Sequence, residues 1–324
     1  MKILVTGGAG YIGAHTVREL VSQRYEAVVV DSLERGSLHT RLHVPFYEGR
    51  ITDAAFLDQV FEQERPDAVI HFAAYKAPNE SMRNPISYFH NNVGGSLILF
   101  ETMLRHNVTS VVFSSSCSIF GNPTHLPVSE DAPFHPESVY GESKLMTETM
   151  LKWLNTTCGL KFSALRYFNA SGASLDASLG EDWTTTSNLI PLVMKAALGK
   201  APSVVIFGSD YPTRDGTAVR DYVHVVDLAR AHVKALEQLL HVQKCTAYNL
   251  GTGVGSTVQE VIMGIKRISG IDFPVEYMPR RSGDPVAIWA DNRKVEQELG
   301  WKAQYGLETI LQTAWTWHSA HSEG

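Results

Sequence analysis

Apolar positions along the first half of the chain fall into two kinds of segment that alternate. The short segments are continuous runs rich in β-branched residues, which is typical of strands buried on both faces of a parallel sheet. We expect these strands at residues 2–6, 27–30, 67–72, 110–114 and 162–166. The longer segments carry apolar residues three and four positions apart and predict helices at residues 11–23, 86–106 and 141–155.

Strands that alternate with helices in this way predict an α/β fold, here a Rossmann-type doubly wound parallel sheet with helices on both faces. In such a sheet, ligands bind where the strands end on their carboxyl side. The functional residues of this half of the chain should therefore follow directly after the strands.

The pattern changes after Asn169, where longer irregular segments predict a smaller, mixed α/β lobe. Within it, the dipeptide Asp215-Gly216 predicts a β-hairpin. A strand, a helix and a strand then predict a return to the first sheet, at residues 222–226, 227–240 and 248–251. We therefore expect two domains, residues 1–168 with 222–250 and residues 169–221 with 251–324.

Composition removes several classes of protein from consideration. The 324 residues carry a formal charge of -6 and no block rich in Lys and Arg, so a nucleic-acid or anionic-membrane partner lacks its electrostatic footprint. No apolar run approaches the roughly 18 residues that a transmembrane helix needs. The 13 histidines are scattered along the chain, and we expect core, surface or turn roles for them rather than a metal site. The three cysteines have no CxxC spacing, which favours a reducing cytoplasm over a disulfide framework.

The first predicted strand runs into a glycine-rich turn that opens a helix. Gly7, Gly10 and Gly13 would allow the tight turn and the close approach of a pyrophosphate to the helix N-terminus. Asp31 ends the next strand, where a carboxylate accepts hydrogen bonds from ribose hydroxyls and repels a 2′-phosphate. This spacing predicts NAD rather than NADP, whereas a purely structural turn followed by a surface Asp is the alternative.

A second group of residues predicts acid–base catalysis. Tyr140 and Lys144 lie four positions apart and therefore share one helix face. A phenol has a pKa of about 10, which a neighbouring ammonium and a cationic nicotinamide would lower until the phenol is a usable base. Ser116 follows the strand at 110–114 and can hydrogen-bond a substrate hydroxyl. Each feature alone is commonly structural, and the combination favours catalysis.

Together these residues resemble the extended short-chain dehydrogenase/reductase superfamily, and more closely the UDP-glucose 4-epimerases. The resemblance covers almost the whole chain and is carried by residues 6–13, Asp31, 71–74, 91–93, 114–121, 140–144, 166–169, 188–191, 220–224 and 280–284. It implies an NAD-dependent isomerase, a UDP-hexose substrate, a transient 4-keto sugar, a cytoplasmic location and a homodimer. Apolar positions on helices 86–106 and 141–155 would form the dimer contact, although burial within one subunit gives the same periodicity.

The resemblance also implies a role for individual residues. The catalytic group would be Ser116, Tyr140 and Lys144. NAD would be bound by Gly7, Gly10, Tyr11, Ile12, Gly13, Asp31, Ile51, Phe72, Ala73, Ala74, Lys76, Asn91, Ser114, Tyr140, Lys144 and Tyr167. The UDP-sugar would be bound by Lys76, Ser116, Tyr140, Phe168, Asn169, Asn188, Leu189, Arg220, Tyr222, Arg281, Asp284 and Ile288.

Two departures from the family pattern limit what the resemblance implies. Arg50 stands where the family usually has an Asp near adenine, which suggests stacking of Arg50 on that ring in place of a hydrogen bond. Ile288 is a mid-sized residue at a position that influences acceptance of an N-acetyl group, so the sugar's C2 substituent stays open.

Related chemistries stay in view as alternatives. Dehydratases and decarboxylases of the same superfamily carry acids just after the strand-end Ser or Thr, where this chain has Cys117 and Ser118. Without a carboxylate to protonate a leaving hydroxyl, epimerisation is favoured. A non-catalytic NAD-sensing protein is the third hypothesis, although it would have little need for the catalytic group.

Overall fold

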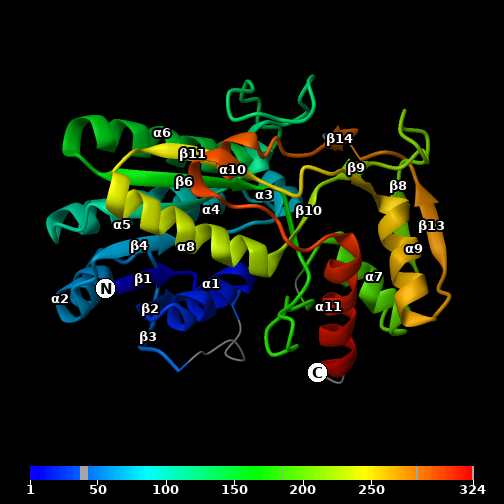
Figure 1. Cartoon of the computed structure of the whole chain (residues 1–324), viewed down its shortest axis with the longest axis horizontal. Helices are drawn as coiled ribbons and strands as arrows, with labels where there is room; N and C mark the ends of the chain where they lie inside the picture. The colour runs from blue at the N-terminus through cyan, green and yellow to red at the C-terminus, as the bar shows by residue number, and fades with distance from the viewer. Residues whose placement is uncertain (37–42, 185, 282–283, 323–324) are drawn as a thin grey trace. The chain divides into compact units, whose positions relative to one another are not determined.

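A computed structural model describes residues 1–36, 43–184, 186–281 and 284–322, which form two compact units (Figure 1). The first unit consists of Met1–Gly121, Phe134–Arg166 and Ala229–Tyr248. The second unit consists of Asn122–Pro133, Tyr167–Leu228 and Asn249–Gly324. Residues 122–133 and 222–228 thus fall in the second unit, whereas the sequence placed them in the first domain.

A seven-stranded sheet forms the centre of the first unit. Its strands are β1 (Lys2–Thr6), β2 (Glu26–Asp31), β3 (Phe46–Glu48), β4 (Ala68–His71), β5 (Ser110–Ser116), β6 (Lys161–Tyr167) and β11 (Thr246–Leu250). The spatial order is β11-β6-β5-β4-β1-β2-β3, and β1 pairs parallel with both β2 and β4. The predicted α/β sheet is confirmed, including the return of the chain to it at β11.

Helices cover both faces of this sheet (Figure 1). They are α1 (Tyr11–Ser22), α2 (Ala54–Glu64), α3 (Pro78–Arg83), α4 (Pro85–Tyr88), α5 (Gly95–Arg105), α6 (Val139–Cys158) and α8 (Val225–Val242). Buried residues of α2, α5 and α6, such as Phe61, Phe100 and Leu151, form one core with the strands. Helices α1 and α8 lie on the opposite face (Figure 1).

The segment predicted as one helix at 86–106 is not a continuous α-helix. Between α4 and α5 the chain forms a π-helical segment, η2 (Phe89–Gly94), that carries Asn91 and Asn92. A π segment turns the side chains after it onto a different face, and such segments occur frequently at functional sites. A short 3₁₀ helix, η3 (Cys117–Ile119), follows β5.

The second unit combines short strands with helices. Its strands are β7 (Asn169–Ser171), β8 (Val204–Phe207), β9 (Val219–Arg220), β10 (Tyr222–His224), β12 (Ser256–Thr257), β13 (Val275–Met278) and β14 (Ala287–Ile288). The helices are α7 (Leu189–Ala197), α9 (Val258–Ser269), α10 (Arg293–Leu299) and α11 (Leu307–Ala320). Among the described residues of the whole chain, no helix combines the length and apolarity needed to cross a membrane.

The hairpin predicted at Asp215-Gly216 is wrong. Strand β8, before this dipeptide, pairs with β13, whereas β9, after it, pairs with β12 and β14. The dipeptide instead closes a loop in which the Tyr211 N–H donates to the Gly216 carbonyl at 2.9 Å. The turn chemistry was recognised correctly, but long-range strand pairing decided where the flanking segments go.

Candidate functional site

The glycine turn after β1 is packed too closely to hold a side chain. Gly7 has a φ of +74°, and a Cβ there would lie 2.6 Å from the Ala73 nitrogen. A Cβ at Gly13 would lie 2.2 Å from the Gly7 carbonyl oxygen. Gly10 is the N-cap of α1 and provides no side-chain acceptor for the helix's first N–H groups. This bare helix end, reached only past glycines, fits a pyrophosphate.

Asp31 lies at the carboxyl end of β2 beside the glycine turn. Its carboxylate accepts the Ala9 N–H at 3.0 Å and the Leu33 N–H at 2.9 Å. Burial raises the pKa of Asp31, and the two N–H donors lower it in part. Each oxygen of the Asp31 carboxylate keeps a second lone pair, so the carboxylate can accept hydrogen bonds from the two hydroxyls of a ribose.

The remaining predicted cofactor residues of the first unit lie around the ends of neighbouring strands. Tyr11 and Ile12 begin α1, and residues 72–74 follow β4. The Lys76 Nζ is 5.9 Å from the centroid of the Tyr11 ring. Ile51 is 4% exposed and packs near Gly95 at the start of α5.

Arg50 is held by neighbours of its own unit. Its guanidinium is 3.1 Å from the Glu34 carboxylate, and hydrogen bonding to Tyr75 raises the pKa of Arg50 further. The side chain is 54% exposed. Stacking of Arg50 on an adenine ring stays a prediction, and it would compete with these two contacts.

Ser116, Tyr140 and Lys144 come together at the end of β5. The Ser116 side chain lowers the pKa of the Tyr140 phenol, and the Lys144 Nζ donates to the Ser114 carbonyl at 2.7 Å. Ser116 also accepts the Ser118 N–H at 3.2 Å and so caps η3. The structural role and the effect on the phenol therefore coexist at Ser116.

Helix α6 is fixed at its start, which sets the position of Tyr140. The Ser138 hydroxyl caps the helix by accepting the Gly141 N–H, and the Tyr140 N–H donates to the Ser81 hydroxyl at 3.1 Å. A Cβ at Gly141 would lie 2.6 Å from the Ser118 carbonyl oxygen. The helix start can therefore approach the end of β5 only because residue 141 is a glycine.

The electrostatics of this cluster differ from the sequence-based expectation. Burial raises the pKa of Tyr140 to about 12, against a smaller lowering by Ser116. Burial also lowers the pKa of Lys144 to about 7, which the nearby Glu148 carboxylate opposes. The Lys144 Nζ is 5.9 Å from the Tyr140 ring centroid, and its hydrogen bond goes to the strand. Burial therefore dominates the pKa of Tyr140, and activation of the phenol by Lys144 stays a prediction.

Sequence reasoning gave no role to Asn92, which connects two parts of the site. Asn92 is 2% exposed, and its amide donates to the Tyr75 carbonyl at 3.0 Å and to the Ser143 hydroxyl at 3.1 Å. It also accepts the Tyr75 N–H at 2.8 Å and a hydrogen bond from Asn91. Asn92 thus fastens the loop that carries Lys76 to α6. A buried amide inside an apolar helix pattern was the available signal.

His71 is a second buried polar residue at this edge. Its Nδ1 hydrogen-bonds with the Thr6 hydroxyl at 2.7 Å and its Nε2 with the Ser96 hydroxyl at 2.9 Å. Burial, with a contribution from the Lys144 charge, lowers the pKa of His71 to about 3. The imidazole is therefore neutral at physiological pH and joins β1, β4 and α5 without adding charge.

In the second unit, two of the predicted substrate residues, Arg220 and Ile288, share one small sheet, and Asp284 lies just before its strand β14. Arg220 on β9 donates to the carbonyls of Val219 and Pro285 at 2.9 and 2.8 Å. Its guanidinium also lies 3.9 Å from the Asp284 carboxylate. Ile288 on β14 is the register partner of Arg220 and is 4% exposed. Arg220, Asp284 and Ile288 are therefore brought together, although they are far apart in the sequence.

The other predicted substrate residues of this unit have varied surroundings. Tyr222 pairs in register with Asn169 between β10 and β7, and its ring packs in the unit's core. The Asn188 amide donates to the Glu181 carboxylate at 2.7 Å, directly before Leu189 begins α7. Phe168 is 4% exposed, and Tyr167 precedes it at the end of β6. The Arg281 guanidinium lies 3.5 Å from the centroid of the Phe207 ring.

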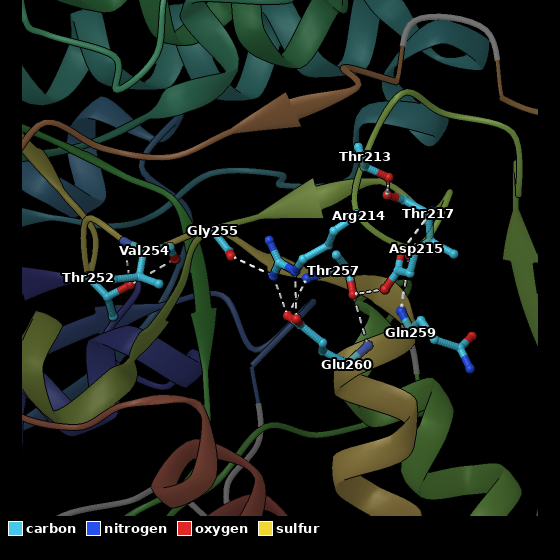
Figure 2. A network of polar contacts seen from close by, with 10 residues as sticks. All are labelled: Thr213, Arg214, Asp215, Thr217, Thr252, Val254, Gly255, Thr257, Gln259 and Glu260. Atoms are coloured by element: carbon cyan, nitrogen blue, oxygen red, sulfur yellow. Dashed lines mark hydrogen bonds and ion pairs between the residues drawn. The ribbon is translucent and has the colours of Figure 1, made fainter.

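A polar network anchors the strand that carries Arg220 (Figure 2). Thr257 is the register partner of Val219, and its hydroxyl donates to the Asp215 carboxylate at 2.5 Å. The same hydroxyl accepts the Glu260 N–H at 3.0 Å as the cap of α9. Arg214 pairs with the Glu260 carboxylate through two nitrogens. The loop before β9 is thereby fixed to the start of α9.

Comparison with known proteins extends the similarity to the whole chain. A model of the NAD dependent epimerase/dehydratase family matches residues 3–251. A UDP-glucose 4-epimerase of Halalkalibacterium halodurans is 45% identical, over 100% of this chain and 97% of the relative.

Solved structures of UDP-glucose 4-epimerases are also similar to this chain over its full length. The UDP-glucose 4-epimerase of Stenotrophomonas maltophila, with bound NAD and formylated UDP-arabinopyranose, matches with a TM-score of 0.97 at 40% identity, over 100% of this chain and 99% of that chain. The enzyme of Bifidobacterium longum, in complex with NAD+ and UDP, matches with a TM-score of 0.94 at 39% identity, over 100% of both chains.

Proposed function

This chain belongs to the NAD dependent epimerase/dehydratase family, and within it to the NAD-using UDP-glucose 4-epimerases, and on that premise we propose that it interconverts UDP-glucose and UDP-galactose. The observation that carries the proposal is the placement of Tyr140 and Lys144 one helix turn apart on α6, with the Lys144 Nζ donating to the Ser114 carbonyl of β5 at 2.7 Å. A phenol, a hydroxyl and an ammonium at the edge of a dinucleotide-binding sheet suit oxidation of an alcohol.

The cofactor fits the first unit because Gly7 and Gly13 leave room for a pyrophosphate and Asp31 offers a carboxylate to the ribose. When bound, NAD supplies an acceptor for the hydride of the sugar carbon and later returns that hydride. Lys144 would hold the cofactor's ribose at the same edge. Because the hydride returns, the reaction has no net redox change.

The chain's own residues would move the proton. Tyr140 would take the proton of the sugar 4-hydroxyl, and Ser116 would hold the oxygen as it becomes a ketone. The ketose would then turn within the site so that its other face receives the hydride, which would invert the configuration at C4. Tyr140 would return the proton to the 4-oxygen, and this would complete the epimerisation. Cys117 and Ser118 follow Ser116 and place no carboxylate there to expel a second hydroxyl, which disfavours a dehydratase.

The second unit would bind the nucleotide. Arg220 and Arg281 suit the two phosphates, because guanidinium groups bind phosphate oxygens in a bidentate manner. Asp284 suits a uridine ribose hydroxyl, with Asn188, Leu189 and Tyr222 completing the set. Ile288, beside Arg220, would limit the space for groups on the sugar.

We also propose a homodimer in the cytoplasm. Large apolar side chains are exposed on neighbouring helices of the first unit, with Ile86 82%, Leu97 49% and Trp153 66% exposed. A second copy of the chain would cover these residues on α4, α5 and α6. The cytoplasm is favoured because Cys117, Cys158 and Cys245 form no disulfide among the described residues. Sedimentation velocity tests the dimer, and a monomer at micromolar concentration would refute it.

The test incubates the purified protein with UDP-galactose, UDP-glucose and their N-acetyl forms, without added cofactor, and separates the products. We expect interconversion of UDP-glucose and UDP-galactose without accumulation of NADH. Tyr140→Phe should lower kcat by at least about 100-fold while NAD stays bound. Tyr277→Phe, on an exposed tyrosine of β13, is the matched control. A 4-keto-6-deoxy product, or a Tyr140→Phe variant with near-normal turnover, would reject the proposal.

A further inference from the structure

A buried ion pair lies behind the catalytic group and has no part in the reaction as described so far. The Glu148 carboxylate on α6 binds the Arg166 guanidinium of β6 through two contacts, at 2.9 and 2.7 Å. The two side chains are 1% and 3% exposed. Removing two charges from water costs several kcal/mol, and well-packed apolar residues often serve stability equally well. The pair is therefore a weak candidate for a stabilising device alone.

The position of Glu148 connects it to both parts of the catalytic group. Glu148 follows Lys144 by one helix turn on α6, and its Oε1 accepts the Ser115 hydroxyl at 2.5 Å. Ser115 is the residue between Ser114, whose carbonyl accepts the Lys144 ammonium, and Ser116, whose side chain lowers the pKa of the phenol. One carboxylate therefore ties the end of β5 to the helix that carries the proposed base.

Arg166 holds Glu148 from the other side. Its guanidinium lies over two aromatic rings, 4.8 Å from the centroid of Phe134 and 5.5 Å from that of Phe120. Stacking and the two-pronged contact with the carboxylate together leave the Arg166 side chain little freedom. Glu148 is thus fixed at both oxygens, by Arg166 and by Ser115.

We propose that Glu148 is a positioning residue for the reaction: through Ser115 it sets the register between the end of β5 and α6, and with it the placement of Lys144 and Ser116. This inference rests on the proposed function. The Glu148 charge also supports Lys144: burial lowers the pKa of Lys144, and the Glu148 carboxylate opposes this by favouring the ammonium form. His71 is also coupled to the charge of Lys144, but its imidazole is neutral.

Ser115→Ala tests the link without disturbing the ion pair. The variant removes one hydroxyl that is 0% exposed, and the side chain touches neither substrate nor cofactor in the proposed reaction. Ser163→Ala is the matched control, because Ser163 lies on the neighbouring strand β6, is 1% exposed and has a hydroxyl without a hydrogen-bond partner among the described residues. Both changes replace a buried serine on the same sheet with alanine.

We expect Ser115→Ala to lower kcat about tenfold at unchanged KM for UDP-glucose, because small displacements of catalytic groups slow the chemical step more than they weaken binding. NAD content should match that of Ser163→Ala, which should keep kcat within about twofold of wild type. The thermal midpoint of Ser115→Ala should be the lower of the two, because only this variant loses a hydrogen bond to a buried carboxylate. Glu148→Gln, which loses the charge as well, should lower kcat further. If Glu148→Gln fails to fold, the comparison of Ser115→Ala with Ser163→Ala still tests the positioning role.

Equal kcat in Ser115→Ala and Ser163→Ala would overturn the inference, as would a rise in KM at constant kcat or a loss of NAD specific to Ser115→Ala. These results differ from failure of the proposed function. In that case the wild-type protein itself would not interconvert the two UDP-hexoses, and the positioning role would fall with it.

Discussion

Replacing Thr257 by Ala should destabilise the second unit at the network that anchors β9 (Figure 2). Thr257 is 0% exposed and caps α9, accepting the Glu260 N–H while the Glu260 carboxylate accepts the Thr257 N–H at 2.9 Å. Loss of such a cap costs about 1 kcal/mol. Loss of the Thr257 hydrogen bond to the Asp215 carboxylate adds about 1 kcal/mol, because Asp215 keeps its two contacts with Thr217.

The expected loss is therefore about 2 kcal/mol in the free energy of unfolding, or a fall of about 5 °C in the thermal midpoint. Differential scanning calorimetry and urea unfolding measure it. Thr257→Ser, which keeps the hydroxyl, should recover most of the loss. Thr316→Ala, on an exposed threonine whose hydroxyl donates to the Gln312 carbonyl within α11, should stay within about 0.5 kcal/mol of wild type. If Thr257→Ala is as stable as Thr316→Ala, the reasoning from the cap is refuted.

Two further predictions concern the first unit. Gly13→Ala should abolish bound NAD, because its Cβ would lie 2.2 Å from the Gly7 carbonyl oxygen. Gly306→Ala is the control: its Cβ meets open space, so this variant should keep bound NAD. The NAD released when the purified proteins are denatured measures the occupancy, and full occupancy in Gly13→Ala would contradict the prediction. His71→Gln should flatten the acid dependence of stability. Because burial lowers the pKa of His71 to about 3, the unfolded chain alone takes up this proton below about pH 6.5, and the wild type loses up to about 1.4 kcal/mol per pH unit. Urea unfolding at pH 7 and pH 5 should show a smaller loss in His71→Gln, and equal losses would contradict the assignment.

Much of the first unit could be predicted because its signals are local. A strand buried on both faces is a continuous apolar run, and each of the five strands expected in the first half of the chain appears within two residues of its predicted bounds. The glycine turn and Asp31 follow from a fixed spacing around β1 and β2. Tyr140 and Lys144 are four residues apart on one helix, so their proximity needs no knowledge of the fold.

What could not be predicted depends on contacts between distant residues. Asn92 acts through Tyr75 and Ser143, which are 17 and 51 positions away along the chain. The hairpin at Asp215-Gly216 failed for the same reason, because pairing of β9 with β14 places Val219 opposite Ala287, far along the sequence. Local turn chemistry fixes a bend but does not choose the partner of the strand that follows it.

The pKa of the Tyr140 phenol also could not be predicted from the sequence, because burial by the fold sets it. This pKa decides when the phenol can act as a base. Because burial raises the pKa of Tyr140 to about 12, the neutral phenol is favoured at pH 7. Lys144, with a pKa of about 7, is only partly charged under the same conditions. Burial thus disfavours the charged forms of both groups, and positive charge entering the site with a ligand favours the phenolate. Because Glu148 is held by Arg166 and cannot turn away, the helix keeps a fixed negative charge that supports the ammonium of Lys144. We therefore expect the proposed base to gain phenolate character when positive charge lies beside it.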